Sequence, residues 1–148
     1  MISGSAGCVL CLDAATALGD TVRSLYLFEP PFIVNDNRPP MPTDYIEHLE
    51  SLVARGDRSA AVEYFMTNAL LIPAEFVAGM KADPSWASME RYAHTYAYEG
   101  RICAGTQEGS LSPATVGRPK LLCWWRSVET ASVISMTGPA PWPISCRT

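Results

Sequence analysis

The amino-acid sequence predicts a mostly helical α/β fold with one or two parallel β-strands. A turn of small residues at 3–7 leads directly into an apolar helical pattern over 8–18. A short apolar run at 24–28 follows and ends at Glu29-Pro30-Pro31, where the prolines cannot continue a ladder of strand hydrogen bonds. A turn, a helix and a strand in this order indicate half of a βαβ unit, the repeating element of α/β folds, with no first strand before the turn.

The helix and the strand of this unit are each supported by their composition. Residues 8–18 consist mainly of apolar and small side chains, and Gly19 follows at the position where helices commonly end. Residues 24–28 combine leucine with aromatic side chains and contain no charge. Such a run is typical of a strand that is buried on both faces of a parallel sheet.

The segment after the strand is predicted to be helical. A proline-rich loop over 32–42 leaves the sheet, and four amphipathic helices follow it, the first over 43–54. Their apolar stripes indicate that they pack on a surface beneath them. The other three helices are marked by residues that typically begin a helix: Asp57, Pro73 and Asp83-Pro84.

The last part of the chain has a different character. Residues 104–118 are mainly glycine, serine, threonine and proline, and 119–125 could form one more strand. After Arg126 there is no clear period of either helix or strand, and 138–143 are rich in proline. Two interpretations stay open: the paired Trp124 and Trp125 mark an interface, or the tail after Leu122 is read in a shifted frame, which translating the DNA in its other two frames would test.

Charge and hydropathy exclude several classes of protein. The 148 residues carry a formal net charge of −4 without any run of lysine or arginine. Such a surface repels nucleic acid and offers no basic face to a membrane. No apolar run approaches the about 20 residues of a membrane-spanning helix, and 1–5 lack the basic start of a secretory signal. We therefore expect a cytoplasmic protein with no nucleic-acid or membrane partner.

The cysteines do not form a recognisable metal site. There are five of them at irregular spacing, and Cys8 and Cys11 form a CxxC pair. This pair lies within an apolar helical pattern and has no second pair or nearby histidine, so a zinc site is not expected. Buried thiols in a reducing compartment are the simpler interpretation. We expect no metal ion and no cofactor.

The turn at 3–7 contains the strongest chemical motif of the chain. Its sequence, Ser-Gly-Ser-Ala-Gly, fits small-x-Ser-x-Gly, a looser form of GxSxG. A nucleophilic serine at a strand-to-helix turn needs small neighbours because the chain folds back on itself there. The following helix then offers amides and a positive dipole end to a developing oxyanion. The motif predicts Ser5 as nucleophile and the Ala6 amide as oxyanion donor, whereas the alternative is that Ser5 merely caps the helix.

Several segments together resemble the middle of an α/β-hydrolase-fold enzyme. The turn at 5–7 leads into 10–15, and the strand ends in Glu29-Pro30-Pro31. The likeness covers about residues 3–100 and departs at Ser3, where the family usually has glycine. Three later segments are similar to the helical cap that one bacterial branch of the family inserts after the sixth strand: 42–45, 61–67 and 89–95.

The resemblance implies a partial α/β-hydrolase fold made of three parts. Residues 1–31 would supply the nucleophile-elbow helix and the following strand of the hydrolase core. Residues 32–100 would form the helical cap, and 101–148 a linker, one strand and an irregular tail.

The resemblance also implies a triad of serine, acid and histidine in this chain order. Ser5 matches the nucleophile position. The acid normally follows the seventh strand, where Glu129 is out of pattern, and some members place it after the sixth strand, where Glu29 stands. The competing interpretation, which we favour, is that Glu29 is a carboxylate bonded to loop amides. The histidine should come from a late loop, but no histidine follows His94. His94 itself could reach a substrate pocket or be a structural histidine. His48 lies on the polar face of its helix.

Two functional hypotheses follow from these observations. In the first, the chain is an incomplete and inactive piece of a serine hydrolase whose intact relative cleaves an ester or amide bond of a small apolar molecule. In the second, it is a non-catalytic helical module that binds a partner, or a second copy of itself, through exposed apolar surface. A third possibility is a poorly stable gene remnant, because a lone pair of strands buries little apolar surface.

Overall fold

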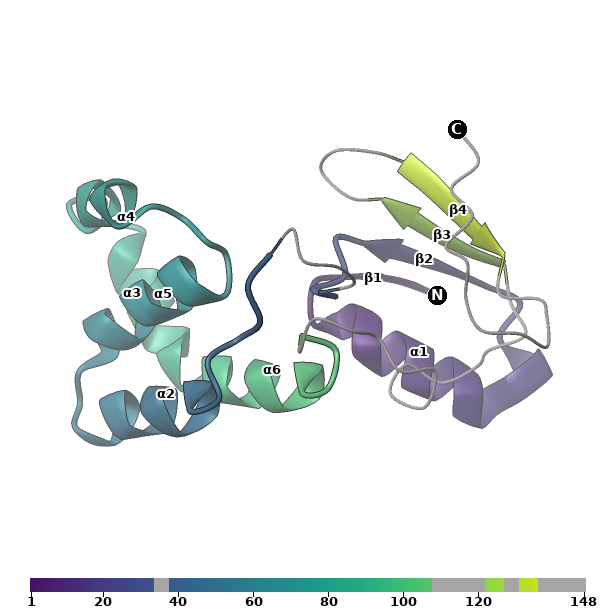
Figure 1. Ribbon diagram of the computed structural model, residues 1–148, viewed down its shortest axis with the longest axis horizontal. Helices are drawn as coiled ribbons and strands as arrows, with labels where there is room; N and C mark the ends of the chain where they lie inside the picture. The colour runs from purple at the N-terminus through teal and green to yellow at the C-terminus, as the bar shows by residue number, and fades with distance from the viewer. Residues whose placement is uncertain (34–37, 108–121, 127–130, 136–148) are drawn as a thin grey trace. The chain divides into compact units, whose positions relative to one another are not determined.

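The computed structural model describes residues 1–33, 38–107, 122–126 and 131–135, the last two stretches as backbone only. The chain divides into two compact units (Figure 1). Met1–Pro39 with Ile102–Thr148 form one, which we call the sheet unit, and Pro40–Arg101 form the other, the helical unit.

The sheet unit is built around a four-stranded sheet of order β1-β2-β3-β4. The first three strands are parallel to one another, and β4 is antiparallel to β3. This sheet is larger than the one or two parallel strands expected from the sequence. The strands are β1 (Ile2–Gly4), β2 (Ser24–Phe28), β3 (Leu122–Arg126) and β4 (Ala131–Ser135).

The βαβ unit is complete in the structure. Helix α1 (Gly7–Leu18) and a short 3₁₀ turn (Gly19–Thr21) connect β1 to β2, and Gly4 pairs in register with Phe28. The expectation that the first strand is absent was therefore wrong. The reason is physical: a strand of three residues is shorter than any window in which a period of two can be recognised.

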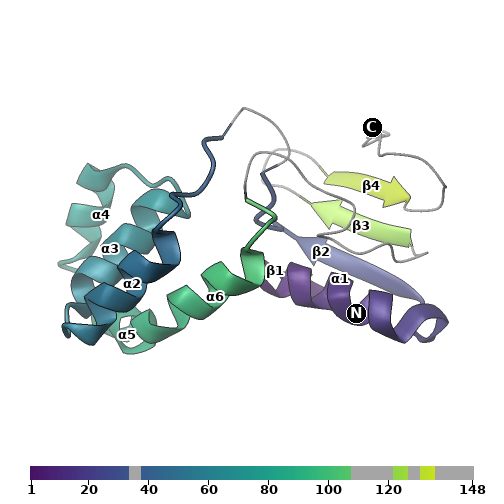
Figure 2. The ribbon, with the colours of Figure 1, turned by 60° about the horizontal axis from the view of Figure 1, so that its bottom comes forward.

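One face of the sheet is covered by α1 (Figure 2). Cys8, Leu12 and Ala15 of the helix pack against Leu25 and Leu27 of β2, and all five are buried.

Burial alternates along β2, so its other face is open: Tyr26 is 36% and Phe28 44% exposed. The expectation that this strand is buried on both faces was therefore wrong, because a single described helix covers only one set of alternate side chains.

The helical unit has a core of its own. Its helices pack on one another around a shared apolar cluster. Asp57 caps α3 as predicted, accepting a hydrogen bond from the Ala60 N–H at 3.1 Å. The helices are α2 (Tyr45–Ala54), α3 (Arg58–Asn68), α4 (Ala74–Met80), α5 (Trp86–Tyr92), a 3₁₀ turn (Ala93–Thr95) and α6 (Tyr96–Cys103).

The predicted features of the tail are only partly described. The strand expected at 119–125 corresponds to β3, whose described residues begin at Leu122. Strand β4 lies where the sequence showed no clear period. Glu129, and the proline-rich stretch at 138–143, lie outside the described residues.

Candidate active site

Ser5 occupies a sharp turn between a strand and a helix. Strand β1 ends at Gly4, α1 begins at Gly7, and Ser5 between them has φ 50°. This left-handed conformation is uncommon for a residue other than glycine, and it concentrates at functional sites. The Ser5 side chain is exposed. A serine hydroxyl held in this way stands at the carboxyl edge of a parallel sheet, beside the N-terminus of a 12-residue helix.

Backbone hydrogen bonds hold this turn on both sides. The Ser5 N–H donates to the Phe28 carbonyl oxygen at 3.0 Å, which ties the turn to the end of β2. The Ser5 carbonyl oxygen accepts from the Cys8 N–H at 2.9 Å, which ties it to the first turn of α1. The unusual φ of Ser5 is therefore maintained by both neighbouring elements.

Gly7 lies close to the Ser3 side chain across this turn. A Cβ atom at Gly7 would lie 2.5 Å from the Ser3 Oγ and 3.9 Å from the Ser3 Cβ. The first distance is a clash and the second an ordinary contact. The motif at 3–7 predicts small residues on either side of Ser5. The short distance to the Ser3 Oγ is a physical reason for the small residue at position 7.

We expect Gly7→Ala to lower the free energy of unfolding by about 1 kcal/mol or less, because the Ser3 hydroxyl can rotate away from the added methyl group. The clash involves one atom, the Ser3 Oγ, so its removal in Ser3→Ala/Gly7→Ala should abolish the loss. In that background the alanine should even stabilise slightly, because alanine favours a helix over glycine. Thermal unfolding of the four proteins of this double-mutant cycle measures the effect, and equal losses in both backgrounds would contradict the account.

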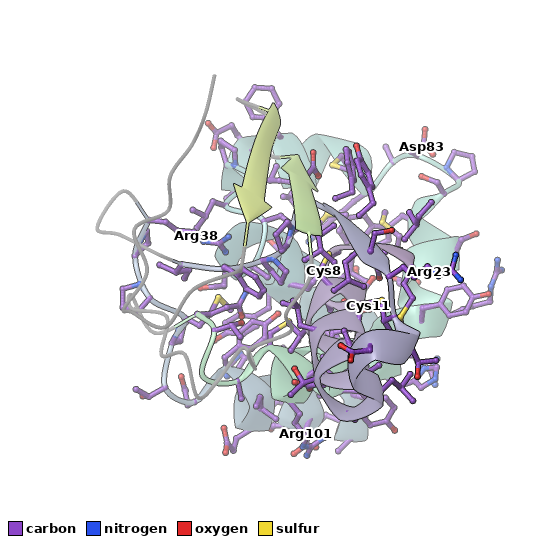
Figure 3. All side chains as sticks on the ribbon, turned by 90° about the vertical axis from the view of Figure 1, so that its right-hand side faces the viewer. Cys8, Cys11, Arg23, Arg38, Asp83 and Arg101 are labelled. Carbon is purple, nitrogen blue, oxygen red and sulfur yellow. The ribbon has the colours of Figure 1, made fainter. Side chains whose placement is uncertain are left out.

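Cys8 lies directly below the turn and is not a competing nucleophile. Its Sγ is 3.5 Å from the Phe28 carbonyl oxygen and 3.6 Å from that of Ser3, so the thiol donates toward the ends of both strands. Burial raises the pKa of the Cys8 thiol to about 11, with the nearby Cys11 adding to the rise and the bond to Phe28 opposing it. The thiol therefore stays protonated at neutral pH. Figure 3 shows both cysteines on α1.

Glu29 and Ser5 each directly follow one of two neighbouring strands. Glu29 comes after β2 and Ser5 after β1, and the last pair of these two strands is Gly4 with Phe28. Glu29 also has a left-handed backbone, with φ 48°, and its side chain is exposed. The structure thus brings together two of the residues that the sequence singled out.

A small apolar cluster lies next to the turn. Ala6 of the turn and Val9 of α1 pack with Cys103, and Phe32 and Ile102 pack against these three residues. Two chain segments that are far apart in sequence are joined here, since the Ile33 N–H donates to the Thr106 carbonyl oxygen at 2.9 Å. Sequence reasoning missed residues 102–107 as neighbours of the site, and no motif in them could have revealed it.

Both histidines of the sequence belong to the helical unit. The His48 ring is exposed and lies 4.4 Å from the Tyr64 ring, centroid to centroid. The Nδ1 atom of His94 is 3.1 Å from the Arg91 carbonyl oxygen, and its ring meets Tyr98 edge-on. Each imidazole is thus engaged within the helical unit.

No group of three or more histidine, cysteine, aspartate or glutamate side chains in the described part of the chain could hold a metal ion. None of the described helices is long and apolar enough to span a bilayer.

Comparison with known proteins places the fold. No protein-family model and no curated protein matches the chain. Among solved structures, an alpha/beta hydrolase from Sphaerobacter thermophilus DSM 20745 is similar, with a TM-score of 0.67 and 36% sequence identity over 82% of this chain. The match covers 47% of that hydrolase, so the chain spans about half of its length. The chain therefore has a partial α/β-hydrolase fold, as its sequence predicted.

Proposed function

We propose that Ser5 is the nucleophile of a serine hydrolase that acts on an ester or amide bond of a small apolar molecule. One observation carries the proposal: Ser5 takes a left-handed backbone conformation between β1 and α1, in a chain that is similar to an alpha/beta hydrolase. A serine that only capped the helix would need no such conformation, because N-cap residues adopt extended backbone angles.

The chemistry follows from the position of Ser5. Its Oγ would attack the carbonyl carbon of the substrate and form an acyl-serine intermediate. The oxyanion would develop beside the Ala6 N–H and the N-terminus of α1, where backbone amides and the helix dipole stabilise negative charge. Glu29, at the neighbouring strand end, is the proposed acid of the triad.

These 148 residues are proposed to turn over substrate very slowly on their own. A triad also needs a base that takes the serine proton, and neither histidine of the sequence lies in the sheet unit. Loss of the triad base or nucleophile in a serine protease lowers kcat by about a millionfold. We therefore expect a nucleophile that reacts with strong electrophiles but does not cycle at an enzyme-like rate.

The experiment that tests the proposal is covalent labelling with a fluorophosphonate. Ser5 should be labelled only slowly at alkaline pH, because no triad base activates it, and Ser5→Ala should lose all specific labelling. Ser3→Ala is the matched control, because Ser3 lies two residues away and its loss should leave labelling intact. Intact-protein mass spectrometry measures all three, and equal labelling of the wild type and Ser5→Ala would contradict the assignment.

A second candidate function is a non-catalytic interaction module. It is favoured by the open face of the sheet, where Ile2 is 81% exposed and Tyr26 and Phe28 are partly exposed. Strand β1 is moreover an edge of the sheet, and unpaired edges recruit other strands. Sedimentation velocity over a range of concentrations discriminates the two functions: concentration-dependent association that Ile2→Asp abolishes supports the module, and a monomer at all concentrations argues against self-association.

A further inference from the structure

The Cys8 thiol connects the two strands that lead to the turn at Ser5. Cys8 is completely buried on the face of α1 that packs against β2 (Figure 3). Its Sγ lies 3.5 Å from the Phe28 carbonyl oxygen and 3.6 Å from the Ser3 carbonyl oxygen. Ser3 belongs to β1 and Phe28 is the last residue of β2, so one side chain of the helix contacts the backbone of both strands.

The Phe28 carbonyl oxygen also holds Ser5 itself. It accepts a hydrogen bond from the Ser5 N–H at 3.0 Å in addition to the contact with the Cys8 thiol. The Cys8 N–H in turn donates to the Ser5 carbonyl oxygen at 2.9 Å. The backbone bonds of Ser5 on both sides therefore end at Cys8 or at an oxygen that Cys8 contacts, and they maintain the φ of 50°.

We propose that Cys8 is a positioning residue for the Ser5 nucleophile, because its thiol fixes the carbonyl oxygen to which the Ser5 backbone is bonded. The inference rests on the proposed function and assigns a further residue to it. A displacement of about 1 Å at a reacting group can lower a rate about a hundredfold. Ser5 can therefore lose reactivity while the sheet unit stays folded.

The chemistry of a neutral thiol suits this place. A carbonyl oxygen has two lone pairs, and at Phe28 the Ser5 N–H takes one and the Cys8 S–H can take the other. Burial raises the pKa of the Cys8 thiol to about 11, with the nearby Cys11 adding to the rise and the bond to Phe28 opposing it. The thiol keeps its proton at neutral pH and remains a donor, whereas a thiolate would place a negative charge against two carbonyl oxygens.

The test is the rate of fluorophosphonate labelling of Ser5 at one alkaline pH below the pKa of Cys8. Cys8→Ala removes the donor and should lower the rate about tenfold or more. Cys8→Val also lacks a donor but fills the site, so it should be slow as well, and it replaces Cys8→Ala in the comparison if the alanine variant does not fold. Cys8→Ser restores a donor of similar size and should stay within about threefold of the wild-type rate.

Leu12→Ala separates positioning from a general loss of stability. Leu12 is fully buried on the same face of α1, and its replacement removes more side-chain volume than Cys8→Ala does. It should therefore destabilise the sheet unit more than Cys8→Ala. Its labelling rate should nevertheless stay within about threefold of the wild type, because Leu12 does not contact the turn. Circular dichroism at the labelling temperature shows that each variant compared is folded.

Infrared absorption of the S–H group gives a second readout, because hydrogen bonding lowers the S–H stretching frequency. The difference spectrum between the wild type and Cys8→Ser isolates the Cys8 band. This band should lie below the frequency of an unbonded thiol in an apolar solvent. A band at the unbonded frequency would show that the thiol donates to neither carbonyl oxygen, and the inference would be wrong.

The labelling outcomes distinguish this inference from the proposed function. If Ser5 is labelled in the wild type and equally fast in Cys8→Ala or Cys8→Val, the inference is wrong and the nucleophile assignment stands. The same holds if Cys8→Ser is as slow as these variants, or if Leu12→Ala slows labelling as much as they do. If Ser5 is never labelled in the wild type, both the proposed function and the inference fail.

Discussion

Replacing Trp86 by alanine is expected to lower the free energy of unfolding of the helical unit by about 3–5 kcal/mol, the usual cost of emptying a buried tryptophan site. Trp86 is 5% exposed at the start of α5 and belongs to the core of the unit. Its Nε1–H donates a hydrogen bond to the Ser59 Oγ at 2.8 Å. Packing and a polar contact between α5 and α3 are therefore lost together.

Two variants separate these contributions. Trp86→Phe keeps most of the ring volume but loses the bond to Ser59, so it should cost about 1–2 kcal/mol. Tyr92→Ala on the same helix is the matched control, because Tyr92 is 62% exposed and its loss should change stability by about 0.5 kcal/mol or less. Denaturant unfolding followed by far-UV circular dichroism measures all three, and a loss below about 1 kcal/mol for Trp86→Ala would show that the core is assigned wrongly.

Replacing Leu12 by alanine should have a comparable effect on the sheet unit. Leu12 is fully buried on the face of α1 that covers β2, where it packs with Leu25 and Leu27. Removing its side chain should therefore cost about 2–5 kcal/mol. Hydrogen exchange of the amides of β2 measures the loss within this unit.

The same helix supplies the control for Leu12. Leu10→Ala removes an identical side chain that is 51% exposed, and it should leave the protection of β2 nearly unchanged. If Leu10→Ala and Leu12→Ala weakened β2 equally, the orientation of α1 on the sheet would be wrong.

Most of the secondary structure around the site was predictable from sequence. The predicted strand at 24–28 is β2, and the helix at 8–18 is α1 with one more residue at its start. Both have apolar patterns that favour a single structure over several residues. Strand β1 was missed because three residues carry no period, although the small-residue turn after it pointed to its end.

Burial and long-range contacts were less predictable. An apolar run such as β2 does not reveal whether one or both faces are covered, because that depends on elements elsewhere in the chain. Ser5 and Glu29 were both identified as candidates, but their adjacency depends on the register Gly4 to Phe28, which no local pattern encodes. The contact of Cys103 with Ala6 joins segments separated by the whole helical unit, so it too emerges only from the fold.

The proposed function requires that Ser5 can accept an acyl group. The most direct measurement is to incubate the protein with an activated p-nitrophenyl ester, digest it, and locate the acyl group by peptide mass spectrometry. We predict one acyl group on Ser5 and none in Ser5→Ala. An acyl group found instead on Cys11 or a lysine, with Ser5 unmodified, would contradict it.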